Sequence, residues 1–401
     1  ALLGLISAVI TFVFMVVVNL GQTIVWDQLA QAVGIAKPIF TLIVCSLGGL
    51  LVGVLVKIFG DHSGIFAEMM DEFGHTGRFN YRHAPGIVLT ALASLISGGS
   101  LGPEAPLADA CGSAGTWLSD RLKLPDRETR SLGFSGISGM LAAFITSPFG
   151  GALLGLESAH AGISYPWTLF PSLLSSAFAT VAFVLLSGGF FGTLYRFPAY
   201  QPLLRDLLWA VPLGLLGAVA GAIFMVAFKR LRQLMQPLSR HLVLRGLIGG
   251  VGLGIAGALL PLTLFSGEAE TAEIIYRATE IGAAALIVLA LVKLLITSLC
   301  LATGFKGGYI FPTLFAGVAL GMALHLIFPA IPEAVAVAAT LGGALVATLK
   351  APIFSALFIM VLVQRETAPV VAIAVIVGAL ATARISMIPR QPVQEQTDAA
   401  G

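Results

Sequence analysis

The sequence is poor in charged residues, which make up 10% of its 401 positions, whereas hydrophobic residues make up 57%. An ordinary soluble domain carries about 25% charged residues. A chain of this length with so little charge cannot cover a large water-exposed surface, which excludes the ordinary soluble classes. Its 22 Lys and Arg face 20 Asp and Glu, and no long basic tract occurs, so we expect no nucleic-acid partner.

Cysteine is also scarce, and the usual catalytic motifs are missing. The three cysteines Cys45, Cys111 and Cys300 lie in or beside apolar runs without a C-x-x-C spacing, which favours small buried residues over metal ligands or disulfides. The sequence contains no H-E-x-x-H, no metal-spaced His/Cys cluster and no nucleophile with a paired base. We therefore predict that the protein is not an enzyme and needs neither metal nor cofactor.

What the chain has in abundance is long apolar segments, and its mean hydropathy is +0.97. Runs such as 1–20, 37–59 and 281–302 are long enough to cross ~30 Å of hydrocarbon. Several other runs are shorter and end at Gly or Pro. Broken and re-entrant helices of this kind survive in a membrane only where protein or a water-filled cavity surrounds them. The sequence thus predicts an all-α polytopic membrane protein in a lipid bilayer, with broken or re-entrant helices.

Features between and within the spans add three expectations. One loop carries five basic residues and no acid, and the positive-inside rule predicts that it is cytoplasmic: Lys229, Arg230, Arg232, Arg240 and Arg245. Ser266 to Glu280 is polar and acidic, and we expect it to be a connection. Gly48, Gly49 and Gly53 are predicted to form a close-packing face on the second span.

One stretch, Gly98–Pro106, combines three Gly, two Pro and one carboxylate inside an apolar environment. A Gly/Pro break followed by an apolar helical run is typical of a helix that begins inside the membrane. Its free N–H groups and the positive end of its dipole can then face an anion. The sequence therefore points to an anion site at this helix start.

The two halves of the chain repeat this pattern. Gly98-Gly99 precedes Pro103 at the spacing at which Gly307-Gly308 precedes Pro312, and Ser147-Pro148 is followed later by a similar Ala351-Pro352. Chance recurrence of Gly and Pro is the alternative. A duplicated plan is typical of transporters and channels whose site lies between two repeats. We predict a first repeat over residues 1–200, a second over 201–390 and a polar tail over 391–401.

These motifs resemble those of a known family. Gly99–Pro103 resembles the G-K/R-E-G-P motif of the CLC chloride channels and transporters, Gly307–Pro312 their G-x-F-x-P region, and His62–Phe66 their G-S-G-I-P motif. The order and spacing match over most of residues 40–365. The resemblance is closest to a divergent bacterial branch that has L-G-P-E in the first of these motifs.

The resemblance implies a CLC-type fold with two inverted structural repeats and a homodimer with one pore per subunit. It implies the inner (plasma) membrane of a bacterium as the location of a multi-pass chain. The implied substrate is a small, chloride-like inorganic anion near the membrane midplane. By the same resemblance the anion is held by the Ser63 hydroxyl and the N–H groups of Tyr309 and Ile310. The remaining residues of the implied site are Gly64, Ile65, Leu101, Gly102 and Phe311.

The sequence departs from the family at several positions, and one of them is Phe66, where the G-S-G-I-P motif has Pro. The outer gating Glu of the family aligns with Leu101, and its inner proton-transfer Glu aligns with Ser158, next to Glu157. The family's central Tyr has no counterpart near Arg384–Met387. Because these groups couple chloride to protons in family antiporters, their loss predicts channel-like or uncoupled anion flux.

Two carboxylates and one lysine leave alternatives open. Glu104 lies one turn after Leu101 and is either a displaced gate or a group that satisfies its own helix N-terminus. Glu157 is a second gating or proton candidate, although we expect it rather to organise a helix end. Lys306 either raises the local anion concentration at a pore mouth or snorkels without contacting the ion.

The sequence therefore supports several functions. The first is passive or weakly coupled anion conduction, and the second is proton-coupled transport with Glu104 as the gate. A third changes the substrate to bicarbonate, nitrate or fluoride. A non-conducting structural or regulatory protein is the fourth.

Overall fold

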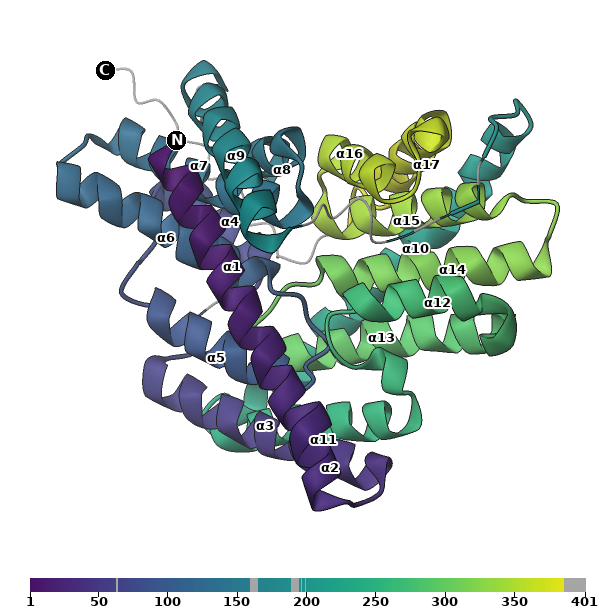
Figure 1. The fold of residues 1–401 in the computed structure, drawn as a ribbon, viewed down its shortest axis with the longest axis horizontal. Helices are drawn as coiled ribbons and strands as arrows, with labels where there is room; N and C mark the ends of the chain where they lie inside the picture. Colours follow the sequence, from purple (N-terminus) through teal and green to yellow (C-terminus); the bar gives the residue numbers. More distant parts are fainter. Residues whose placement is uncertain (63, 159–164, 189–194, 196, 199, 386–401) are drawn as a thin grey trace, which may run out of the picture.

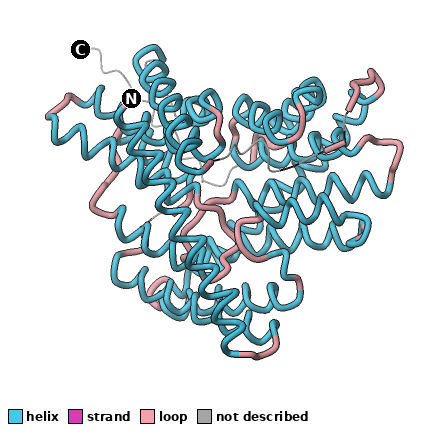
Figure 2. The backbone as a smooth tube through the Cα atoms, in the orientation of Figure 1, coloured by secondary structure: helices cyan, strands magenta, loops and turns pink. Residues whose placement is uncertain are grey.

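The computed structural model describes the chain except for residues 63, 159–164, 189–194, 196, 199 and 386–401. The described residues form helices joined by short loops and contain no strand (Figures 1 and 2). The predicted all-α class is thus confirmed for the part of the chain that the structure describes.

The helices of the first half follow one another in this order: α1 (Leu2–Gln22), a π-helical turn (Thr23–Leu29), α2 (Ala30–Val33), α3 (Lys37–Phe59), α4 (Phe66–Thr76), α5 (Ala84–Ile96), α6 (Glu104–Leu122), α7 (Asp126–Ile145), α8 (Pro148–Ser158) and α9 (Tyr165–Ser187). Those of the second half are α10 (Asp206–Met235), α11 (Leu242–Leu259), α12 (Glu268–Ile281), α13 (Ala283–Thr303), α14 (Ile310–Ile327), α15 (Glu333–Leu349), α16 (Pro352–Leu362) and α17 (Ala368–Ala381).

The two halves use the same packing pairs. α7 packs on α6, α8, α9 and α1, and α15 packs in the same way on α14, α16, α17 and α10. α3 lies against α11 and α8 against α16, so the halves meet through equivalent helices. The duplicated Gly/Pro pattern therefore corresponds to duplicated helix packing. The predicted division at residue 200 falls between α9 and α10, and its position stays a prediction.

The repeated X-Pro helix starts have a common backbone cause. Thr146 ends α7 in the left-handed region at φ 49°, and Pro148 opens α8 two residues later. Lys350 ends α15 at φ 55°, and Pro352 opens α16. A left-handed residue stops a helix, and Pro fits the first turn of the next helix because it needs no N–H donor there. Each half thus breaks one helix at the predicted position.

Burial separates lipid-facing helices from internal ones. Among the described residues, seven helices are long and apolar enough to cross a membrane. α1 exposes large apolar side chains along its length, whereas every residue of α14 from Ile310 to Ala323 is buried. A helix that is apolar all round and buried all round is surrounded by protein. α14, together with α15, which is buried from Ala334 to Thr348, therefore lies at the centre of the helix packing.

The segment Ser266–Glu280, which we expected to be a connection, instead forms most of α12, so that expectation is wrong. Gly267, with φ 99°, lies directly before the helix, and Glu268 and Glu270 lie in its first turn, where the helix dipole favours acids. Ile274, Ile275 and Ala278 recur at helical spacing on the buried face. The many polar residues of this segment obscured the helical spacing of its apolar residues in the sequence.

The predicted glycine face of α3 is confirmed. A Cβ at Gly49 would overlap the carbonyl oxygen of Gly246 and would lie 2.7 Å from the Cα of Gly250, both on α11. The helix backbones therefore touch where only glycine fits, as in other small-residue membrane interfaces.

Replacing Gly49 with valine is expected to lower stability by about 1–3 kcal/mol, because the added side chain must push α11 away from α3. Thermal unfolding of the purified protein in detergent measures this loss. Leu47→Val is the matched control on the same helix, since Leu47 is 60% exposed. An equal loss in both variants would contradict the close-packing account.

Candidate functional site

The two duplicated Gly/Pro motifs meet in the centre of the molecule through a single backbone pairing. The N–H of Gly102 donates to the carbonyl oxygen of Gly308 at 2.8 Å, and the N–H of Gly308 donates back to Gly102 at 2.6 Å. Figure 2 shows loops converging between the helices here. This pairing sets the N-terminus of α6 beside the N-terminus of α14.

The carboxylate of Glu104 lies at this junction and is 1% exposed. Its Oε1 accepts a hydrogen bond from the backbone N–H of Phe311, in the first turn of α14, at 3.0 Å. The backbone N–H groups of Ile310 and of Glu104 itself also stabilise the carboxylate. Glu104 therefore contacts its own helix start and, across the junction, the start of the equivalent helix in the other half.

Two glycines leave the space that the Glu104 carboxylate occupies. A Cβ built on Gly102 or on Gly308 would overlap Oε2 of Glu104. Oε2 is buried and has no hydrogen-bond partner among the described residues. The site thus holds one negatively charged group against helix N–H donors, and one oxygen of that group can accept a proton without breaking a hydrogen bond.

Several residues of the expected anion site surround this carboxylate. Tyr309, Ile310 and Phe311 are all buried at the start of α14, and the Tyr309 ring lies 5.4 Å from that of Phe224 on α10. Leu101 is fully buried, with its side chain against Gly307. The carboxylate at this junction therefore comes from Glu104, and position 101 contributes an apolar side chain.

The first motif lies farther toward the side of the basic loop. Gly64 and Ile65 line a cavity there, and Ser63 is outside the described residues. The Lys306 side chain crosses the backbone at Gly64, where any Cβ would overlap it. The structure thus places Gly64 and Ile65 beside Lys306, while Tyr309 to Phe311 lie at Glu104.

Two polar residues of α13 fix the loops around the site. Lys293 is fully buried, and its ammonium group donates to the carbonyl oxygens of Thr263, Leu264 and Phe265 at 3.2, 2.8 and 2.8 Å. Three acceptors match the three donors of an ammonium group, which offsets the cost of burying it.

The second residue is Thr297, one turn after Lys293, which we did not single out from the sequence. Its hydroxyl donates to the carbonyl oxygen of Ser100 at 2.9 Å, and it also lies 3.2 Å from the Ser100 hydroxyl. The available signal was helical spacing, because Lys293, Thr297 and Cys300 lie on one side of an otherwise apolar helix. Thr297 holds the loop that leads to Gly102.

Glu157, the other candidate carboxylate, caps a different helix. Its two oxygens accept the backbone N–H groups of Ile353 at 2.7 Å and Phe354 at 2.6 Å, in the first turn of α16. A carboxylate at a helix N-terminus is stabilised by those donors and by the dipole. The expectation that Glu157 organises a helix end is confirmed. Glu104 and Glu157 thus each connect the first half to a helix start in the second.

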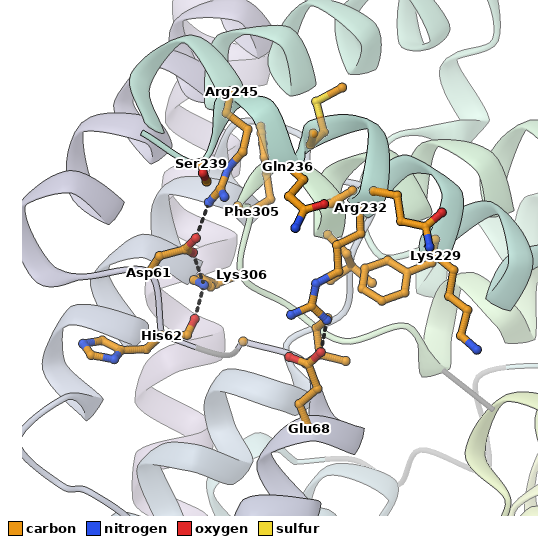
Figure 3. Close-up of a pocket in the computed structure, with 18 residues that line it drawn as sticks. Asp61, His62, Glu68, Lys229, Arg232, Gln236, Ser239, Arg245, Phe305 and Lys306 are labelled. Atoms are coloured by element: carbon orange, nitrogen blue, oxygen red, sulfur yellow. Dashed lines mark hydrogen bonds and ion pairs between the residues drawn. The ribbon is translucent and has the colours of Figure 1, made fainter. Parts of the chain in front are cut away.

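A cavity of about 790 Å³ opens on the side of the basic loop (Figure 3). Its basic lining residues are Lys229, Arg232, Arg245 and Lys306, and its acidic ones are Asp61 and Glu68. Lys306 is 5% exposed, and its ammonium group donates to the His62 carbonyl oxygen. The snorkelling alternative for Lys306 is therefore wrong, because the side chain is buried and bonded.

Asp61 connects two of these cations. Its Oδ2 accepts from Arg245 at 2.6 Å, and its Oδ1 lies 3.5 Å from the Lys306 ammonium group. Burial by itself raises the pKa of Asp61, but the charges of Lys306 and Arg245 outweigh burial and hold that pKa below its usual value. Asp61 therefore stays ionised at neutral pH.

A family model described as voltage gated chloride channel matches residues 48–384 of the chain. The chain is also similar to YfeO of Escherichia fergusonii, a protein named for a proposed role in ion transport. The two are 28% identical over 353 residues, which cover 86% of this chain and 83% of that protein. YfeO of Escherichia coli is similar to the same extent.

Two solved structures share the fold. A slow cyanobacterial Cl⁻/H⁺ antiporter matches with a TM-score of 0.84 and 22% identity over 96% of this chain and 93% of its own. A CLC-type fluoride/proton antiporter matches with a TM-score of 0.81 and 17% identity over 97% and 95%. The predicted CLC-type fold is thereby confirmed.

Replacing Glu157 with leucine is expected to destabilise the protein by about 1–3 kcal/mol, because two N–H groups of α16 lose their acceptor. Glu157→Gln keeps one acceptor oxygen and should lose less stability than Glu157→Leu. Thermal unfolding in detergent compares the two variants. Equal stability of Glu157→Leu and the unmodified protein would contradict the capping role.

Proposed function

The chain belongs to the voltage-gated chloride channel (CLC) family, and we propose that it carries a small inorganic anion across the membrane, with Glu104 as a displaceable gate coupled to protons. One observation supports this gate above the others: the Glu104 carboxylate lies on the N–H of Phe311, between Gly102 and Gly308. A tethered anion already occupies the donors that a transported anion needs.

The gate follows from competition for these donors. While Glu104 is ionised, its Oε1 takes the Phe311 N–H, and a second anion beside it would be repelled. A proton on Oε2, the oxygen without a described partner, neutralises the side chain. A neutral acid accepts hydrogen bonds more weakly than a carboxylate does. The anion then replaces Glu104, and the side chain leaves with its proton.

Proton coupling is the alternative that this geometry favours over passive conduction. Loss of the family's gate at Leu101 suggests uncoupled flux only if no other carboxylate reaches the α14 donors, and Glu104 reaches them. The two structural relatives named above are described as proton-coupled antiporters of chloride and fluoride. Their names are compatible with this proposal and do not select the anion.

The same proposal includes the membrane, the orientation of the chain and its oligomeric state. The chain lies in the inner membrane of a bacterium as a homodimer, with the end of α10 that holds Lys229 and the start of α11 that holds Arg245 facing the cytoplasm. The cavity lined by Lys306 is then the inner vestibule. Seven apolar helices among the described residues support a multi-pass arrangement.

Chloride is our reference substrate, and fluoride, nitrate and bicarbonate are its competitors. The proposed site offers backbone N–H donors, and no cation of the described residues contacts Glu104, which suits a monovalent anion that must leave again. Chloride flux measured with each competitor in excess ranks these anions. Displacement of chloride by none of them would identify chloride as the preferred substrate.

Glu104→Gln should abolish anion-driven proton movement while chloride still moves, because an amide cannot exchange a proton at this site. The test uses proteoliposomes with a chloride gradient and an enclosed pH dye, with an uncoupler control for proton leak. Glu157→Gln is the matched control, an equal loss of charge at a helix cap distant in the sequence. Proton uptake that persists in Glu104→Gln would contradict the gate.

Gly308→Ala should displace the Glu104 carboxylate from the α14 donors without changing Glu104 itself. The added methyl group occupies the space of Oε2 and forces the carboxylate off the Phe311 N–H. We expect faster chloride flux with fewer protons per chloride ion. Gly342→Ala on α15 is the control, because its Cβ would lie 3.3 Å from the Cβ of Ala374, a tight contact that a shift of a few tenths of an ångström relieves. A Gly308→Ala protein with unchanged flux and coupling would contradict the claim that the space left by Gly102 and Gly308 keeps the Glu104 carboxylate on the Phe311 N–H.

A further inference from the structure

Two loops and the start of one helix meet at the vestibule wall and bring two buried cations onto one carboxylate. Arg245 comes from the first turn of α11, Lys306 from the loop between α13 and α14, and Asp61 from the loop between α3 and α4. The side chains of Arg245 and Lys306 are 10% and 7% exposed, whereas that of Asp61 is 40% exposed. The cations are fixed in the wall, and the acid lies toward the cavity.

The cations carry more charge and more donors than Asp61 satisfies. Two positive charges face one negative charge within this trio. A guanidinium group has five N–H donors, and the Nε of Arg245 is buried without a partner among the described residues. An unpartnered buried donor next to excess positive charge favours an additional or replacing anion.

Arg245 also lies close to the C-terminal end of α13. Its Nη2 would lie 3.0 Å from a Cβ on Gly304, the residue that ends α13 at φ 102°. Gly304 therefore allows both the left-handed helix end and the close approach of the guanidinium group. The C-terminus of α13 favours a cation at this point.

We propose that Arg245 and Lys306 form a second anion site, in which a small monovalent anion entering from the vestibule replaces the carboxylate of Asp61. This inference rests on the proposed transport function and adds an inner station to it. The carboxylate of Asp61 defines the sign and approximate size of the group that the site accepts. Asp61 is a tethered competitor, as Glu104 is at the α14 donors.

The chain connects the two sites directly. Lys306 lies five residues before Phe311, and its ammonium group binds the carbonyl of His62, which precedes Ser63 of the first motif. An anion released from the Arg245–Lys306 pair is thus next to that motif and one loop away from the Glu104 site. Glu68, the other acid of the vestibule, instead pairs with Arg232, which is 55% exposed.

Bromide located by anomalous scattering in crystals tests the second site. Crystals of the unmodified protein, Asp61→Asn and Glu68→Gln are soaked in the same series of sodium bromide concentrations. A tethered carboxylate competes at an effective concentration in the millimolar range, so Asp61→Asn should reach equal occupancy at about tenfold less bromide. Glu68→Gln is the matched control because it removes the same charge from the same cavity.

A bromide peak between Arg245 and Lys306 that strengthens in Asp61→Asn and not in Glu68→Gln supports the proposal. No peak there in Asp61→Asn, a peak only at exposed Arg232, or equal strengthening in both variants overturns it. The unmodified protein at rising bromide is a second measurement if Asp61→Asn fails to fold, and a site that stays empty throughout also overturns it.

The same crystals separate this proposal from the transport proposal. Glu104→Gln crystals report whether bromide binds at the Phe311 N–H. Bromide at Arg245 and Lys306 without bromide at Phe311 would refute the Glu104 gate and leave the inner site standing. Bromide at Phe311 without bromide at Arg245 and Lys306 would refute the inner site and leave the Glu104 gate standing.

Discussion

The contact between Glu104 and the N–H of Phe311 depends on one backbone pairing, that of Gly102 with Gly308, and most of the fold serves to keep this pairing in place. Thr297 fixes the loop before Gly102, Lys293 fixes the loop beside it, and α14 is surrounded by other helices. Because α6 and α14 begin at the same point, their N–H donors face one small volume. A negatively charged group is the natural occupant of that volume.

Tethered carboxylates recur wherever the structure collects donors for anions. Glu104 lies on the start of α14, Glu157 on the start of α16, and Asp61 between Arg245 and Lys306. Each accepts hydrogen bonds from a helix start or from a pair of cations. They differ in freedom: Asp61 is part-exposed and can turn into a cavity, whereas Glu104 is enclosed. This difference is compatible with the proposed roles, in which Asp61 competes with anions at the cavity and Glu104 competes with them at the start of α14.

The sequence predicted the elements that local chemistry determines. The span over 37–59, the duplicated Gly/Pro starts and the glycine face of α3 follow from hydropathy and spacing. It could not decide between the two roles of Glu104, because Glu104 and Phe311 are 207 residues apart and meet only through the Gly102–Gly308 pairing. Asp61 was missed since an acid in a short polar loop carries no periodic signal. Lys306 was left ambiguous because its burial depends on segments that are distant in the sequence, the loop at Asp61 and the start of α11 at Arg245.

The central claim is that Glu104 and the transported anion compete for the same N–H donors, and chloride titration calorimetry across a pH series tests it most directly. We predict that chloride binds the purified protein more tightly as pH falls and that binding takes up protons, which buffers of different ionisation enthalpy reveal. Both effects should vanish in Glu104→Gln. Chloride binding that is independent of pH and takes up no protons in the unmodified protein would contradict the account.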